Sequence, residues 1–285
     1  MHFGRGIVAT QEDFGSQGRL PTHPELLDYL AARFVESGWD VKALHRLIVS
    51  SATFQQSSHV PAAIAARDPD NQLLARGPRR RLPAEAIRDS ALGASGLLNR
   101  AIGGPSVKPY QPAGLWEQAG TGKTYKQDTG TNLYRRSLYT FWKRTLPPPS
   151  MITFDAMSRE VCTARREITT TPLQSLVLLN DPQFVEAARR VAEHALRRFP
   201  GDAAERNRVV FRSLTGRLPD EVEAGILARL FEEQRALFAG RADDAVRLLA
   251  VGDAIADPGL DRADLAAQTM VASADMNFDE FVVVR

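Results

Sequence analysis

Cysteine is almost absent from this sequence, because Cys162 is the only one among 285 residues. A single thiol excludes an internal disulfide, a cysteine-rich zinc site and the two-cysteine motif that attaches haem c. It does not show whether the protein works in an oxidising or a reducing compartment, since a single thiol survives in both. Long apolar runs are absent as well, and no stretch approaches the roughly eighteen residues that a membrane helix needs. The sequence therefore predicts no membrane span.

Targeting and metal-binding patterns are also absent. The first residues, MHFGRGIVATQEDFG, do not place basic residues before an apolar stretch and a small-residue cleavage site, as a signal peptide does. The five histidines have no ligand spacing, and no H-x-x-x-H occurs. His45 and His194 fall within predicted helices, where we expect hydrogen-bonded structural histidines. We therefore predict no metal and no cofactor in this chain.

The stretch AGTGKTY at 119–125 comes closest to a phosphate-binding motif. A phosphate loop reads G-x-x-x-x-G-K-[ST] and lies between a strand and a helix. Here Glu117 stands where the first glycine should be, and its carboxylate would oppose a phosphate. Proline and turn-forming residues replace the strand and the helix. We interpret this stretch as a glycine-rich loop that binds no nucleotide.

Basic residues are concentrated in the middle of the chain, although the net charge is only +2. Residues 76–166 contain 16 basic and 6 acidic side chains, whereas 167–285 contain 14 and 20. These arginines either pair with the acidic third segment, which we favour, or form a surface for a polyanion such as a sulfated glycan. The candidate binding residues combine arginines with an aromatic ring, and they are Arg135, Arg136, Trp142, Arg159, Arg165 and Arg166.

Helix signals dominate residues 1–75. The sequence THPE at 22–25 has the form of a capping box and predicts a helix that ends at Gly38. Asp40 is expected to cap a second helix, so that the two form a helical hairpin. The apolar residues expected on the inner faces are Leu26, Leu27, Leu30 and Phe34 in the first helix, and Val41, Leu44, Leu47 and Ile48 in the second.

The middle of the chain is less regular. Four prolines in 57–83 indicate a connector, and a helix is expected over 84–102, ended by Gly103-Gly104. Glycine and proline then predict a loop over 103–131. We predict a helix over 133–145, with Tyr134, Leu138, Phe141, Trp142 and Thr145 on one face.

The C-terminal part has the clearest helix signals. Thr171 and Asp181 each precede a proline in a way that is typical of a helix start, and Asp220 follows a proline at another. Further helices are expected up to Gly216 and over 242–250 and 261–275, while 278–285 fits either a helix end or a strand. The prediction is a mainly α fold, a multi-helix bundle of helical hairpins with a long Gly/Pro-rich irregular central segment. We divide it into 1–75, 76–167 and 168–285 as parts of one composite domain.

Three residues are candidates for chemistry. His23 lies beside a helix start and near Asp13, and a carboxylate and an imidazole can act together in general acid–base catalysis. Arginines on both sides of Cys162 are able to lower the pKa of its thiol and make it reactive. The alternative, which we favour, is that Cys162 is buried and inert and the arginines tie segments together.

Several stretches together resemble the planctomycete-type domain of unknown function. They follow one another in the expected order and include HFGRGIVATQEDFG, LPTHPELLDYLAARFVESGWDVKALHRLIVSSATFQQSS, NQLLARGPRRRLPAEAIRDSAL, GGPSVKPYQPAGLWE, YRRSLYTFWKR, FDAMSREVCTARRE and TPLQSLVLLNDPQFVEAAR. The chain departs from the usual pattern at Met157, Ile168-Thr169 and Ala274-Asp275. We expect the aspartate at 275 to weaken the packing of an apolar helix.

The resemblance implies a module of a larger, exported bacterial protein that accompanies cytochrome-c-like modules, with haem c carried by those partners. It implies a periplasmic or cell-surface location and further sequence before Met1, and it supplies no catalytic residues. We favour a non-catalytic interaction or scaffold module. The alternatives are a carbohydrate-active or redox enzyme with a site near His23, Arg159 and Cys162, and binding of an anionic polysaccharide through the basic segment. Nucleic acid is not an expected partner.

Overall fold

The structure is a computed structural model that describes residues 2–120 and 122–284. The chain divides into two compact units, each assembled from separate stretches. Unit 1 comprises Met1–Arg81, Thr163–Arg165 and Val283–Arg285, and unit 2 comprises Leu82–Cys162 and Arg166–Val282. Helices dominate both units, which confirms the predicted mainly α class. The division at residues 75 and 167 stays a prediction.

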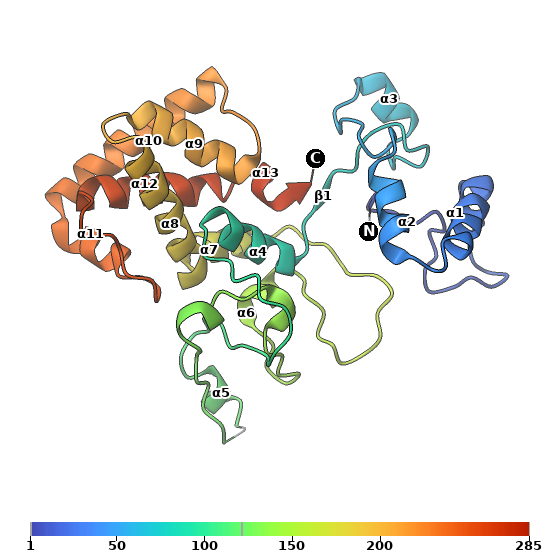
Figure 1. Cartoon of the computed structure of the whole chain (residues 1–285), viewed down its shortest axis with the longest axis horizontal. Helices are drawn as coiled ribbons and strands as arrows, with labels where there is room; N and C mark the ends of the chain where they lie inside the picture. Colours follow the sequence, from blue (N-terminus) through green and yellow to red (C-terminus); the bar gives the residue numbers. More distant parts are fainter. Residues whose placement is uncertain (1, 121, 285) are drawn as a thin grey trace. The chain divides into compact units, whose positions relative to one another are not determined.

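Unit 1 contains the predicted helical hairpin, formed by α1 (Pro24–Glu36) and α2 (Val41–Val49). The Asp40 carboxylate accepts a 2.9 Å hydrogen bond from the Ala43 N–H, which confirms the predicted cap. A short helix, α3 (Ala62–Arg67), interrupts the expected connector. The strands β1 (Arg80–Arg81) and β2 (Val283–Val284) pair antiparallel (Figure 1).

The predicted capping box at the start of α1 is wrong. The residue before the helix is His23, and no side chain caps the first turn. Thr22 is engaged elsewhere, because its N–H and its hydroxyl both donate to the Ile7 carbonyl, at 2.9 and 3.3 Å. A long-range contact has therefore taken the side chain that local sequence assigned to the helix.

The apolar faces of the hairpin are only partly covered. Neither α1 nor α2 contains a buried residue, and Val41, expected to be buried, is 54% exposed. Leu27 is also exposed, whereas Leu30 and Leu44 are half-buried. The two short helices pack on each other, but their contacts leave the edges of both apolar faces exposed to solvent.

Unit 2 is built around α8 (Pro182–Arg198) and α12 (Arg262–Asp275), which pack against each other. Figure 1 shows α10 and α11 beside α12 in the same unit. Its other helices are α4 (Ala84–Ala94), α5 (Leu115–Gln118), α6 (Pro149–Thr153), α7 (Pro172–Asn180), α9 (Ala203–Thr215), α10 (Glu221–Gly240), α11 (Ala242–Leu249) and α13 (Asp279–Val282).

The C-terminal helices start and end close to the predicted positions, although Thr171 forms no side-chain cap on α7. The Asp181 carboxylate accepts from the Gln183 N–H at 3.0 Å, and Asp220 forms a reciprocal capping box with Glu223. Gly216 ends α9 with a φ of 81°, a conformation that favours glycine. The tail, which the sequence fitted as either a helix end or a strand, contains both, because α13 is followed directly by β2.

The helix predicted over 133–145 is wrong. This stretch holds only one 3₁₀ turn, Ser137–Tyr139. The buried Arg88 guanidinium donates to the carbonyls of Leu133 and Arg135, at 2.9 and 2.7 Å. Those two oxygens would have accepted the N–H groups of residues 137 and 139 in a helix. Hydrogen bonds from the Arg88 side chain of α4 thus take the place of backbone hydrogen bonds within a helix.

Two other central predictions are refined. The helix expected over 84–102 ends at Ala94, because Gly96 adopts a φ of 72° and the chain turns away. The glycine-rich loop follows α5, with Gly120 and Gly122 also at positive φ, and no helix follows it in 122–129. Thr121 of this loop lies outside the described residues. No helix within the described ranges is long and apolar enough to cross a membrane.

Candidate functional site

The proposed catalytic residues are distributed over both units. Asp13 and His23 belong to unit 1, where the Asp13 carboxylate accepts from the Gly15 N–H at 2.8 Å. The His23 Nδ1 lies 3.0 Å from the Thr22 hydroxyl. Cys162 belongs to unit 2 and is exposed, so the expectation that it is buried is wrong. A shared site of the three residues stays a prediction.

Arg166 and Arg159 hold the irregular stretch that contains Cys162. Arg166 forms two hydrogen bonds with the Glu85 carboxylate, at 2.6 and 2.9 Å. Burial raises the pKa of Glu85, but the Arg166 guanidinium outweighs it and the net shift is downward. The Arg159 guanidinium lies 4.5 Å from the centre of the Trp142 ring. These contacts agree with the interpretation that the arginines tie segments together.

Arg135 is buried and bonded to the backbone. Its guanidinium donates to the Pro105 carbonyl at 2.8 Å and to the Gly103 carbonyl, and it stacks on the Tyr139 ring at 3.8 Å. The Arg136 guanidinium lies 5.8 Å from the centre of the same ring. Because the Arg135 guanidinium donates to carbonyls of the loop 101–105, this residue does not support the prediction of a polyanion-binding surface.

Sequence reasoning missed Arg88, which is only 3% exposed and bonds to Gln183 at 2.5 Å besides the two carbonyls. Burial lowers its pKa to about 10. The signal was present, since Arg88 lies on the same face of α4 as the buried Ala84 and Ala91. A buried arginine each of whose three nitrogen atoms donates to an acceptor within the protein fixes chain segments rather than binding a ligand.

A buried ionic cluster on α8 was also missed. Glu186, Arg189 and Glu193 are all fully buried on this helix. Glu186 accepts from the Tyr110 and Tyr134 hydroxyls, at 2.9 and 2.8 Å, and Arg189 donates to Glu193 at 2.8 Å. Burial first, and then the Glu186 charge, raise the pKa of Tyr110. This cluster joins segments from three parts of unit 2.

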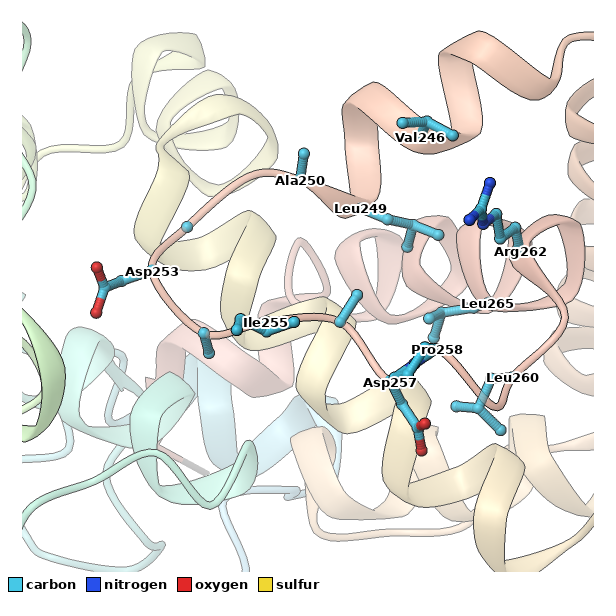
Figure 2. A pocket seen from close by; sticks show the side chains of 13 residues that line it. Val246, Leu249, Ala250, Asp253, Ile255, Asp257, Pro258, Leu260, Arg262 and Leu265 are labelled. Carbon is cyan, nitrogen blue, oxygen red and sulfur yellow. The ribbon is translucent and has the colours of Figure 1, made fainter.

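The same cluster anchors the loop 250–258. The Ala254 N–H donates to Glu186 at 2.7 Å, and the Asp253 N–H donates to the Tyr110 hydroxyl at 2.6 Å. The loop frames a hollow of about 370 Å³ between α11 and the start of α12. Figure 2 shows Leu249 and Leu265 lining it. Because the loop is held by these hydrogen bonds, the shape of the hollow is set by the fold.

Helix α7 buries a glutamine beside Leu178 and exposes three leucines. Its Gln174 is 5% exposed and donates to the carbonyls of Thr153 and Thr169, at 3.0 and 3.1 Å. Three leucines on the opposite side, which we term the leucine face, are exposed. Their exposed fractions are 63% for Leu173, 52% for Leu176 and 40% for Leu179. A helix of a self-contained domain normally shows the reverse pattern.

Unit 1 contains a polar hollow of about 420 Å³, which we term the arginine pocket. Three arginines from distant parts of the sequence line it, together with Asp70 and Gln11. Arg5 forms a 3.3 Å ion pair with Asp70. Arg19 and Arg165 complete the set, and both are exposed. Of the binding residues proposed from sequence, Arg165 is the one that lines a pocket within unit 1.

Comparison with protein families identifies the chain. The family described as protein of unknown function (DUF1553), PSD1, matches residues 1–231. The chain belongs to this family, as the motifs from HFGRG to TPLQSL predicted. No curated protein and no solved structure matches the chain.

Proposed function

We propose that this chain is a non-catalytic interaction module of a larger exported bacterial protein, and that the leucine face of α7 contacts a neighbouring cytochrome-c-like module. The observation that carries the proposal is the exposure of three leucines on one side of α7. Covering an exposed leucine contributes about 1.5–3 kcal/mol when it becomes fully buried. Three such side chains on one short helix give a partner a substantial gain from docking there.

The packing of α7 within unit 2 supports the same proposal. Leu178 belongs to the buried cluster that includes residues of α8, and Gln174 bonds to Thr153 and Thr169, so the helix is already fixed on one side and docking requires no rearrangement of it. Ile152 of the neighbouring α6 is 40% exposed and adds apolar surface. Exposed apolar side chains that gather on fixed elements are typical of protein–protein contacts. Haem c belongs to the partner in this proposal, and the location is the periplasm or the cell surface.

Calorimetric titration of the chain with a purified cytochrome-c-like module tests the proposal. We expect saturable binding that Leu173→Ser combined with Leu176→Ser abolishes. The matched control is Val222→Ser combined with Ile226→Ser, which removes two exposed apolar side chains of α10. Equal affinity of the leucine-face variant and the unaltered chain would refute the proposal. So would a stable dimer of the chain that forms through Leu173 and Leu176.

A further inference from the structure

The arginine pocket of unit 1 has an excess of positive charge. Three guanidinium groups line it, and Asp70 supplies the one carboxylate among the lining residues. The ion pair of Arg5 with Asp70 neutralises one of the three. Arg19 and Arg165 form no ion pair with any other residue that the structure describes. Two guanidinium groups therefore remain free to bind an anion.

Two glycines permit the close packing of the backbone around Arg5. Gly4 has a φ of 73°, and a Cβ added there would lie 3.1 Å from the Arg80 side chain. A Cβ on Gly6 would lie 2.7 Å from the Val8 carbonyl oxygen. Any larger residue at either position would therefore have to displace its neighbours. The sequence GRG therefore allows the backbone on both sides of Arg5 to lie against its neighbours.

Arg19 is held close to the same segment by backbone hydrogen bonds. Its N–H donates to the Thr10 hydroxyl at 2.9 Å, and that hydroxyl donates to the Asp13 carbonyl at 2.9 Å. The Thr22 N–H donates to the Ile7 carbonyl at 2.9 Å. These bonds close residues 7–22 into a loop that begins two positions after Arg5, and this keeps Arg19 in the same part of unit 1 as Arg5.

A second hollow adjoins the arginine pocket and shares Gln11 and Arg19 with it. Its volume is about 620 Å³, and its lining is mainly apolar, including Phe14, Leu20 and Leu27. A few charged groups beside an apolar cavity are characteristic of small-molecule sites. The pair of hollows suits a ligand with a charged head and an apolar or ring-shaped body.

We infer that unit 1 binds a small amphipathic anion, whose sulfate, phosphate or carboxylate group lies in the arginine pocket and whose body lies against Phe14 and Leu20. Guanidinium groups form paired, charge-assisted hydrogen bonds with such oxyanions. Gln11 lies at the boundary of the two hollows and adds an amide donor. The leucine face lies in unit 2 and takes no part in this binding.

Isothermal titration of the whole chain at low ionic strength tests the inference, with phenyl phosphate, phenyl sulfate, benzoate and inorganic phosphate as probes. We expect saturable binding of at least one aromatic anion. Arg19→Gln and Arg165→Gln should each weaken it about tenfold, the loss expected for one charge-assisted contact. Asp70→Asn should strengthen it, because the competing carboxylate is lost. The strongest aromatic probe identifies the oxyanion class.

The matched control is Arg67→Gln, which removes the same charge from the end of α3, outside both hollows. Leu20→Ser should weaken phenyl phosphate but leave inorganic phosphate unchanged. The inference is overturned if no probe saturates, if Arg67→Gln weakens binding as much as Arg19→Gln, or if Arg19→Gln and Arg165→Gln bind like the unaltered chain. Circular dichroism confirms that each variant is folded.

Discussion

The Tyr134 hydroxyl donates a 2.8 Å hydrogen bond to the buried carboxylate of Glu186, across 52 positions of sequence. Tyr134→Phe removes this donor and leaves part of a buried charge unsatisfied, which costs about 1–3 kcal/mol. Urea unfolding should show that loss. Tyr29→Phe is the control, because Tyr29 is 49% exposed on α1 and should change the free energy of unfolding little. Equal stability of the two variants would mean that the ionic cluster contributes nothing.

Gly252 permits the loop 250–258 to approach the same carboxylate. Its φ is 97°, and a Cβ there would overlap the Glu186 side chain. Gly252→Ala should therefore destabilise the chain by at least the roughly 1–3 kcal/mol of a strained backbone. Gly225→Ala, in the open middle of α10, should stabilise it by about 0.5–1 kcal/mol. Thermal melts that move in the same direction for both would contradict this account.

Asp275 should make the stability of unit 2 depend on pH. It is fully buried, and neither carboxylate oxygen has a hydrogen-bond partner within the described residues. Burial, and then the charge of Glu223, raise its pKa from 3.8 to about 8. The folded state therefore holds the proton more tightly than the unfolded state. The free energy of unfolding should fall by about 1 kcal/mol for each unit by which the pH rises from 3.8 to about 8.

The test of this effect is Asp275→Asn, which keeps the shape and cannot ionise. At pH 8 the variant should be more stable than the unaltered chain by more than about 1 kcal/mol, and the difference should shrink as the pH falls towards 4. Urea midpoints across this range measure it. A constant difference would show that Asp275 finds a partner in solution.

The His2–His45 pair should make unit 1 respond to pH in the opposite direction. His2 Nε2 lies 2.8 Å from His45 Nδ1. Burial, and then His45, lower the pKa of His2 below 6.5. The contribution of His2 to the free energy of unfolding is complete above pH 6.5 and is lost as the pH falls through the lowered pKa, by less than about 1 kcal/mol for a group that is only partly buried. An NMR titration of the His2 ring, with His45→Phe for comparison, measures the shift.

Local signals in the sequence identified the helices whose ends depend on their own residues. Asp40 and Asp181 cap the helices that they were predicted to cap, and Asp220 caps the helix predicted to start beside it, because each bond spans only two or three positions. Thr171 precedes its helix as predicted but forms no side-chain cap. The hydrogen-bonded role predicted for His45 is also confirmed. Asp275 stands on a buried helix face, where the sequence indicated an unfavourable position.

The errors arose where a distant side chain decides the local conformation. Residues 133–145 have a helical apolar pattern, but Arg88 takes their carbonyls. Thr22 has the position of a cap, but Ile7 accepts its hydrogen bonds. The arginine pocket could not be predicted for the same reason, since Arg165 joins it from far along the chain. Periodicity reports only the neighbours within one or two turns.

The pairing of β1 with β2 has a consequence for how the protein is made. Residues 80 and 81 leave the ribosome some two hundred positions before their partners, Val283 and Val284. The first unit therefore cannot complete its small sheet until the second has been translated in full. During that interval the edge of β1 is open, and a nascent chain that stalls late in translation would expose it to chaperones or to aggregation.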